Sequence, residues 1–214
     1  MSPSNPSKLP ENDHKDCIHA YIQSLSSEDE EIRRQAIRQL GQLGPAASSA
    51  LPKLRRALTS PDYVIRLEAA IAIGFIGTKE DTNYLLPLLD DEIEAVRFQT
   101  ISALAFLKDS RVTPEFLRIY DTETIHVQDQ ILRALGHLGG PDAYSLLERE
   151  LKADNPTVRI GAVVGFSFLS DPRAYPLLKE VAETDSDELV THEARVALLQ
   201  IEKFCSQDAK KDSQ

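Results

Sequence analysis

Few residues in the sequence have the side chains and the arrangement that catalysis or metal binding requires. His192 and Glu193 are adjacent and could both ligate a metal ion, but there is no second pair of this kind, and one pair leaves a metal site short of ligands. Cys17 lies three residues from His14 and two from His19, so one helical stretch could offer two ligands. We interpret that stretch as an exposed helix with a partly buried thiol, and we predict no metal site.

The two cysteines, Cys17 and Cys205, stand near opposite ends of the chain. Two thiols cannot build a disulfide framework or ligate an all-cysteine cluster within one chain. Either thiol could still be one ligand of an iron–sulfur cluster that bridges a dimer. The sequence has no Gly-rich phosphate loop, serine nucleophile elbow or Cys-His arrangement, so we expect no catalytic residues.

Composition excludes several classes of protein. Acidic residues outnumber basic ones 34 to 24, and the net charge of -10 has the wrong sign for a nucleic-acid-binding protein. The longest small and apolar run, at 69–77, is far shorter than the roughly 20 residues that cross a bilayer. The first residues lack the basic and apolar regions of a secretory signal, so we expect a cytoplasmic protein without a membrane span.

An internal repeat predicts the elements that position these residues. An aliphatic residue followed by arginine, with a small residue three positions later, occurs at Arg33, Arg66, Arg97 and Arg159. Their separations are 33, 31 and 62 residues, and a fifth copy at Gln128 lies 31 residues from both of its neighbours. A degenerate sixth copy fits at Thr191.

Each copy predicts a hairpin of two helices. We call the arginine of each copy, or the residue in its place, the anchor. Apolar residues one position before the anchor and three, four, seven and ten positions after it have the period of a helix with one buried face, as in Ile32, Ala36 and Ile37. Another amphipathic stretch precedes each copy, for example 50–58, and forms the first helix of the hairpin. The helix that carries the anchor is therefore the second helix. We expect one all-α repeat domain at 13–204, with disordered tails at 1–12 and 205–214.

This pattern resembles HEAT-like repeats, in particular the short variety of phycobilin lyase subunits. The resemblance is carried by the aliphatic-Arg steps and by the endings at 40–44, 73–77 and 135–139, such as Leu40-Gly41-Gln42-Leu43-Gly44. It implies a single right-handed α-solenoid of about six HEAT-like helical hairpins. His192-Glu193 is also similar to the His-Glu dyads of deoxyhypusine hydroxylase, but only one dyad occurs here, so the metal ligands of that enzyme are lacking.

The predicted second helices carry another face, almost opposite the core, at one, five and nine positions after each anchor. We predict that this face lines a concave groove that binds a partner through eleven residues: Leu67, Ile71, Phe75, Phe98, Phe106, Asp129, Arg133, His137, Ile160, Val164 and Phe168. Here the phenylalanines are expected to anchor the partner and the polar residues to orient it. The alternative is that closely packed second helices bury these side chains as ordinary core.

The repeated arginines could form an anion-binding ladder. We favour a structural role instead, in which each arginine pairs with an acidic residue at a neighbouring turn, such as Asp62, Asp91 or Asp154.

We interpret the chain as a protein-binding scaffold or assembly factor that needs neither catalysis nor a cofactor. The resemblance to phycobilin lyase subunits implies a phycobilisome-related or photosynthetic role, with a phycobiliprotein or an assembly client as the partner. One alternative is a bilin lyase or isomerase subunit whose groove holds a tetrapyrrole, with Arg133 on a propionate and Asp129 or His137 handling pyrrole protons. The other is an iron–sulfur carrier that uses a terminal cysteine.

Overall fold

The structure, a computed structural model, describes the backbone of residues 11–211 and the side chains of residues 15–204. Helices and short turns account for this part of the chain, which contains no strand. The chain divides into two compact units, with the boundary between Leu107 and Lys108. The single repeat domain expected at 13–204 remains a prediction, and each unit is described by itself.

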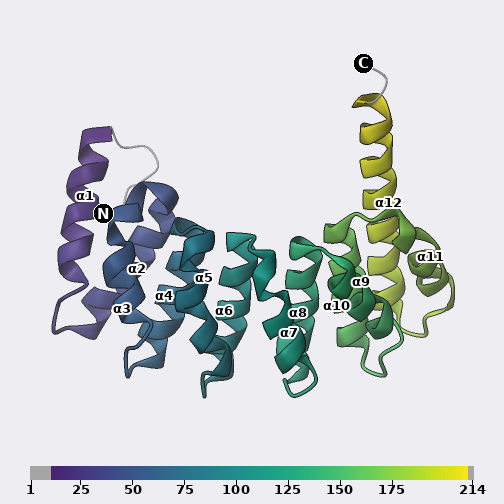
Figure 1. The fold of residues 1–214 in the computed structure, drawn as a ribbon, viewed down its shortest axis with the longest axis horizontal. Helices are drawn as coiled ribbons and strands as arrows, with labels where there is room; N and C mark the ends of the chain where they lie inside the picture. The colour runs from purple at the N-terminus through teal and green to yellow at the C-terminus, as the bar shows by residue number, and fades with distance from the viewer. Residues whose placement is uncertain (1–10, 212–214) are drawn as a thin grey trace. The chain divides into compact units, whose positions relative to one another are not determined.

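Unit 1 contains three helical hairpins, each a first helix followed by a second helix (Figure 1). The first helices are α1 (Glu11–Ser24), α3 (Leu51–Ala57) and α5 (Thr82–Leu85), and the second helices are α2 (Glu30–Leu43), α4 (Tyr63–Ile76) and α6 (Glu94–Leu107). Short 3₁₀-helices extend two of the first helices: η2 (Gly44–Ala50) precedes α3, and η4 (Leu86–Asp90) follows α5. Helix α2 packs against α4, and α4 packs against α6.

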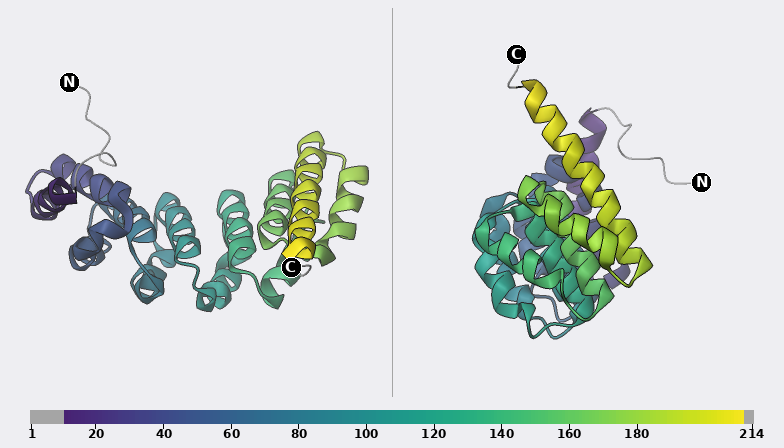
Figure 2. Two further views of the ribbon diagram at one scale, coloured as in Figure 1. Left: turned by 90° about the horizontal axis from the view of Figure 1, so that it is seen from above. Right: turned by 90° about the vertical axis from the view of Figure 1, so that its right-hand side faces the viewer.

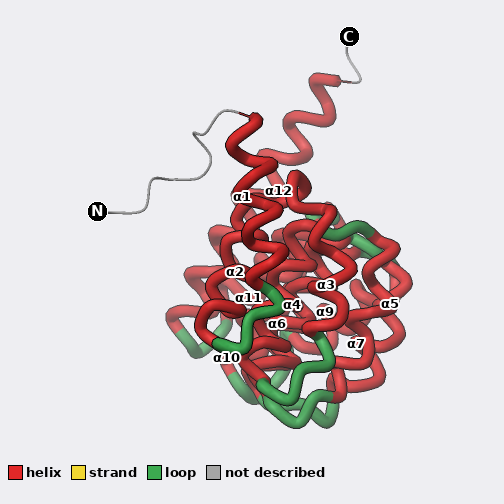
Figure 3. The backbone as a smooth tube through the Cα atoms, turned by 90° about the vertical axis from the view of Figure 1, so that its left-hand side faces the viewer, coloured by secondary structure: helices red, strands yellow, loops and turns green. Residues whose placement is uncertain are grey.

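Unit 2 repeats this organisation. Its first helices are α7 (Thr113–Tyr120), α9 (Pro141–Glu150) and α11 (Tyr175–Thr184), and its second helices are α8 (Ile125–Leu138), α10 (Pro156–Leu169) and α12 (Glu188–Lys211). Helix α10 packs against both α8 and α12. Within each unit the first and second helices form two rows (Figure 2), and short loops join them (Figure 3). The predicted all-α class and its helical hairpins are confirmed.

The ends of the repeat region differ from the expected ones. Helix α1 begins at Glu11 rather than at 13, and α12 continues to Lys211, past position 204. The last turns of α12 extend beyond the neighbouring helices of its unit (Figure 1). Residues 1–10 and 212–214 of the expected tails lie outside the described residues. Within 11–211, no helix combines the length and the apolar character that crossing a membrane requires.

Polar side chains cap the starts of several second helices. The Asp29 carboxylate accepts a hydrogen bond from the amide of Glu31 at the start of α2, and the Asn155 side chain accepts one from Thr157 at the start of α10. Gly139 ends α8 with a φ of 73°, a left-handed conformation that glycine adopts without strain.

The core of each unit lies between its first and second helices and consists of the expected periodic positions. Ile37, Leu40 and Ile73 are almost fully buried. Ile32 departs from the expectation, because 46% of its surface is exposed. It lies in the first turn of α2, the first of the second helices, so no preceding second helix covers it.

Small residues let the second helices approach one another closely. A Cβ atom added to Gly74 would lie 2.9 Å from the Cα of Ala103 on α6, and one added to Gly136 would lie 2.2 Å from the carbonyl oxygen of Gly165 on α10. The glycine-containing endings of the repeat are therefore the places where neighbouring second helices touch backbone to backbone.

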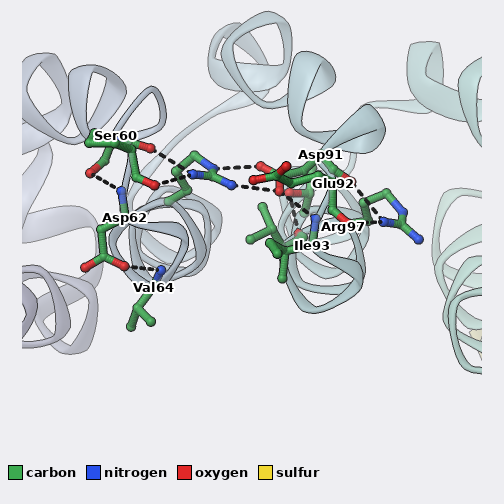
Figure 4. A network of polar contacts seen from close by, with 11 residues as sticks. Ser60, Asp62, Val64, Asp91, Glu92, Ile93 and Arg97 are labelled. Carbon is green, nitrogen blue, oxygen red and sulfur yellow. Dashed lines mark hydrogen bonds and ion pairs between the residues drawn. The ribbon is translucent and has the colours of Figure 1, made fainter.

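The anchor arginine Arg66 joins neighbouring hairpins. Its Nη1 donates to the carbonyls of Ser60 and Pro61, while its Nε and Nη2 donate to the two carboxylate oxygens of Asp91 at 2.7 and 2.9 Å (Figure 4). Burial is the largest single influence on the pKa of Asp91 and raises it, but the hydrogen bonds from Arg66 and from the amide of Ile93, together with the nearby positive charges, bring this pKa below its ordinary value. The expected pairing of an anchor arginine with Asp91 is confirmed.

Arg159 has the same geometry in unit 2. Its Nη1 donates to the carbonyls of Ala153 and Asp154, and its Nε and Nη2 donate to Asp185 at 2.7 and 2.8 Å. The prediction named Asp154 as the partner of an arginine, but Asp154 contributes its backbone carbonyl, and Asp185 supplies the carboxylate. In both anchors the carboxylate comes from the turn before the next second helix, 25 or 26 residues further along the chain.

Asp62 was also expected to pair with an arginine. Its carboxylate instead caps the amide of Val64 at the start of α4 (Figure 4). The side chain of an N-cap residue points along its own helix, which directs it away from the guanidinium of the preceding repeat.

Candidate functional site

Unit 1 carries the first part of the predicted binding face, which we name the unit-1 stripe: Leu67, Ile71 and Phe75 on α4, and Phe98 and Phe106 on α6. Phe75 is 50% exposed and Phe106 is 59% exposed, and the other three side chains are half-buried. The neighbouring helices of unit 1 therefore leave this stripe open instead of sealing it into the core.

A cavity of about 390 Å³ adjoins this stripe between α2 and α4. Its lining consists of Ile37, Arg38, Gly41, Gln42, Glu68, Ile71, Ala72 and Phe75. Arg38 and Glu68 are the charged members of the lining, and they form an ion pair at 2.6 Å. The cavity can accept an apolar side chain, with a polar pair beside it for orientation.

The cavity exists because small residues bring α2 and α4 together below it. A Cβ atom added to Gly41 would lie 3.3 Å from the Cα of Ala72. The larger side chains of Ile71 and Phe75 form the walls around this close contact.

Unit 2 carries the second part of the predicted face, which we name the unit-2 stripe: Asp129, Arg133 and His137 on α8, and Ile160, Val164 and Phe168 on α10. The Nε of Arg133 donates to both carboxylate oxygens of Asp129, at 3.0 and 2.9 Å. Gly161 on α10 leaves room for this pair, because a Cβ atom there would lie 2.7 Å from an oxygen of Asp129. Ile160 and Val164 are half-buried beside it.

His137 stacks on Phe168 across the contact between α8 and α10. The ring centroids are 3.9 Å apart, the planes are inclined by 21°, and Phe168 remains 45% exposed. Partial desolvation of the ring lowers the pKa of His137, although the side chain is still exposed to water, and the positive charge of Lys108 lowers it further. The imidazole is therefore neutral at neutral pH, with one nitrogen able to accept a proton.

Sequence reasoning missed three residues that adjoin the stripes. Tyr63 and Ile125 lie one helical turn before Leu67 and Asp129, on the same face, and both are exposed. Extending the face back by four positions would have found them. Glu68 was missed because its partner Arg38 lies thirty residues away, and only the packing of α2 on α4 brings them together.

The residues considered for metal chemistry belong to both units. His192 is exposed on α12, next to the half-buried Glu193, and Cys17 is half-buried in α1. The side chains of His14 and Cys205 lie outside the described residues. Among described side chains, no group of three or more His, Cys, Asp or Glu could hold a metal ion. The iron–sulfur alternative therefore remains a prediction.

Comparison with protein families decides what kind of chain this is. The family model described as HEAT repeats matches residues 18–105 and 113–199. The chain belongs to the HEAT-repeat family. The two matched segments correspond to the two compact units, and the predicted solenoid class is confirmed for this HEAT-repeat protein.

Individual proteins similar to this HEAT-repeat chain include a bilin lyase subunit. The phycocyanobilin lyase subunit alpha of Nostoc sp. (strain PCC 7120) is 25% identical in an alignment 185 residues long, which covers 77% of this chain and 67% of that protein. The complex of CpcE and CpcF of phycocyanin lyase from Nostoc sp. PCC7120 matches with 24% identity and a TM-score of 0.68, over 91% of this chain and 77% of the matched chain. The resemblance to the phycobilin lyase type of repeat is thereby confirmed.

Designed repeat proteins also share the fold. A designed armadillo repeat protein matches with a TM-score of 0.58 and 20% identity, over 86% of this chain and 99% of the designed one. Such a likeness shows the fold alone, because a repeat architecture hosts many different functions.

Proposed function

We propose that this chain is a non-catalytic protein-binding module, a scaffold or assembly factor whose role is related to phycobilisomes or photosynthesis. The observation that supports it best is the exposed pair of Phe75 and Phe106, whose rings lie 5.3 Å apart next to an open cavity. Aromatic side chains in such positions bury a large area when a partner covers them, and they dominate the energetics of many interfaces.

The partner that fits this surface is another protein. Exposed rings on α4 and α6 present a flat apolar area, while the cavity between α2 and α4 accepts one inserted side chain. The neighbouring ion pair of Arg38 and Glu68 offers polar contacts at its edge. The similar Nostoc structure is a complex of two proteins, which supports a lyase-type subunit or a phycobiliprotein as the partner here.

Binding to CpcF and to phycocyanin tests this proposal. We expect the purified chain to bind at least one of these probes in titration calorimetry, and the double variant Phe75→Ser, Phe106→Ser to bind about tenfold more weakly or worse. Leu199→Ser is the matched control, because Leu199 is an exposed apolar residue on α12 outside both stripes. Absence of binding by the wild type, or an equal loss in the control, would contradict the proposal.

A second candidate function is a bilin-handling subunit, favoured by the similarity to a phycocyanobilin lyase subunit together with the polar end of the unit-2 stripe. Arg133 holds Asp129 through its Nε, so its terminal nitrogens can pair with a propionate of the substrate. His137 is neutral and can accept a pyrrole proton, while Phe168 and Val164 provide apolar surface for the tetrapyrrole.

Added phycocyanobilin distinguishes the two functions. A bilin-handling subunit changes the absorbance spectrum of the pigment, and Arg133→Gln and Asp129→Asn reduce that change. Arg118→Gln on the exposed side of α7 is the control, and it should change the absorbance spectrum of the pigment as much as the wild-type protein does. A spectrum that does not respond to the wild-type protein would reject the bilin-handling function and leave the protein-binding function intact.

A further inference from the structure

A second cavity, of about 250 Å³, lies in unit 1 away from the stripes. Its lining consists of Leu25, Ser26, Arg33, Ile37, Lys53, Arg56, Ala57, Ser60 and Ile65. Three of these residues are cationic and none is acidic. This cavity surrounds the anchor arginine of the first repeat.

Arg33 makes only half of the contacts that Arg66 and Arg159 make. Its Nη1 donates to the carbonyls of Ser27 and Glu28 at 2.7 and 2.8 Å, which is the same pair of backbone contacts that the other two anchors form. In those anchors, Nε and Nη2 then hold a carboxylate in a bidentate pair. In Arg33 these two nitrogens have no such partner.

The missing carboxylate follows from one residue. Asp91 and Asp185 each stand six positions before the next anchor position, and the residue at this place after Arg33 is Ser60. Ser60 still performs the local function of those aspartates, since its hydroxyl accepts a hydrogen bond from the amide two residues later, at 3.2 Å (Figure 4). It has no second oxygen to offer to the guanidinium.

No other carboxylate replaces it among the described residues. The nearest is Glu30, whose oxygen lies 3.7 Å from Nη2 of Arg33, beyond hydrogen-bond distance, and this carboxylate is also shared with Arg34. The Nε of Arg33 donates to no group in the described part of the chain. One edge of the guanidinium is thus left for a ligand.

Lys53 and Arg56 add positive charge to the same cavity. The Nζ of Lys53 is held by the carbonyl of Ile22 and the hydroxyl of Ser26, at 2.8 and 2.9 Å, which leaves its third hydrogen free. Neither Lys53 nor Arg56 has a carboxylate within 4.0 Å among the described side chains. In a chain of net charge -10, these three cations form a locally positive site, because only Arg33 has a described carboxylate nearby, that of Glu30 at 3.7 Å.

We infer that this cavity binds a small free phosphate, which takes the place of the absent aspartate on Arg33. Nε and Nη2 of Arg33 donate to two phosphate oxygens, as the other anchors donate to a carboxylate, while Lys53, Arg56 and the hydroxyls of Ser26 and Ser60 lie around the remaining oxygens. A phosphate dianion fits this site better than a single carboxylate does, because three cationic side chains line the cavity. At Arg66 and Arg159, by contrast, the bidentate pair needs only the single carboxylate of one aspartate.

Inorganic phosphate tests the inference, compared with chloride and with acetate at equal ionic strength. We expect phosphate to raise the melting temperature of the whole chain, and to bind in titration calorimetry more tightly than acetate. Ser60→Asp restores the missing carboxylate, so it should form the bidentate pair with Arg33, raise the melting temperature without phosphate, and weaken phosphate binding by about tenfold or more.

Asn83→Asp is the matched control, because it adds the same charge at an exposed position on α5. It should bind phosphate as the wild type does. Arg56→Gln, which changes an exposed side chain, should weaken binding without unfolding the chain. Equal melting temperatures of the wild type in phosphate and chloride, equal binding of acetate, or undiminished binding by Ser60→Asp would each overturn the inference.

Discussion

The rings of Phe75 and Phe106 lie 5.3 Å apart with an interplanar angle of 36°, one on α4 and the other on α6, and both remain at least half exposed. Two adjacent second helices therefore contribute one ring each to a shared surface. The contact between the rings stabilises the unit only modestly, because water still reaches both of them.

The first prediction tests whether the unit-1 stripe is surface or core. Phe106→Ser should lower the free energy of unfolding by less than about 1.5 kcal/mol, because it removes one aromatic contact and little buried area. Phe116→Ala on α7 should cost about 3–5 kcal/mol, since Phe116 is fully buried and its removal leaves a cavity. Urea unfolding of both variants measures the difference. A cost for Phe106→Ser as large as that for Phe116→Ala would show that the stripe is core.

The second prediction concerns the backbone contact between α8 and α10. Gly136→Ala places a Cβ atom 2.2 Å from the carbonyl oxygen of Gly165, so the helices must move apart, at a cost of about 1–3 kcal/mol or more. Gly41→Ala is the control, because its Cβ atom meets Ala72 at 3.3 Å and a small shift removes the conflict. Thermal unfolding should show a clear loss for Gly136→Ala and little change for Gly41→Ala, to which the higher helix propensity of alanine also contributes.

The third prediction uses the pH dependence of the Arg159–Asp185 pair. Hydrogen bonds from Arg159 hold the pKa of Asp185 below its ordinary value. A carboxyl whose folded-state pKa is lowered stabilises the fold above its unfolded pKa of about 3.9, and this stabilisation is lost as pH falls through the folded value. Asp185→Asn should therefore cost about 3 kcal/mol near neutral pH and progressively less below about pH 4.

Asp121→Asn is the control for that measurement. Asp121 also pairs with an arginine, Arg149, at 2.9 Å, but both side chains are more than half exposed. Its loss should change the free energy of unfolding by less than about 1 kcal/mol near neutral pH. If the two variants were equally destabilised, burial would not be the reason for the strength of the Arg159–Asp185 pair.

The fourth prediction orders the two causes that lower the pKa of His137. Burial is the larger cause and the charge of Lys108 is the smaller one. Phe168→Ala uncovers the imidazole and should raise its pKa toward the ordinary value of about 6.5, and Lys108→Gln should raise it by less. Proton NMR of the imidazole resonances against pH measures both shifts. A larger effect of Lys108→Gln would reverse this order.

Much of the fold could be predicted because the repeat is local and periodic. The positions of Ile37 and Leu40 on one face of α2 follow from helical spacing, and so does the placement of Phe75 on the face of α4 opposite the core. The pairing of Arg66 with Asp91 could also be anticipated, because each repeat presents the same turn to its neighbour.

Contacts between distant residues could not be read from the spacing. Glu68 reaches Arg38 only because the small residues Gly41 and Ala72 allow a close contact between α2 and α4 near this pair. The exposure of Ile32 likewise depends on its place at the start of the stack, not on its residue type or position within the repeat.

By itself, the amino-acid sequence determined the helical hairpins and the faces of each second helix, because a helix turns by about 100° per residue whatever surrounds it. The packing of the helices was needed to learn which side chains stay open and where cavities form between second helices. The physical reason is that these properties depend on how closely two backbones approach, and that distance is decided by both surfaces in contact.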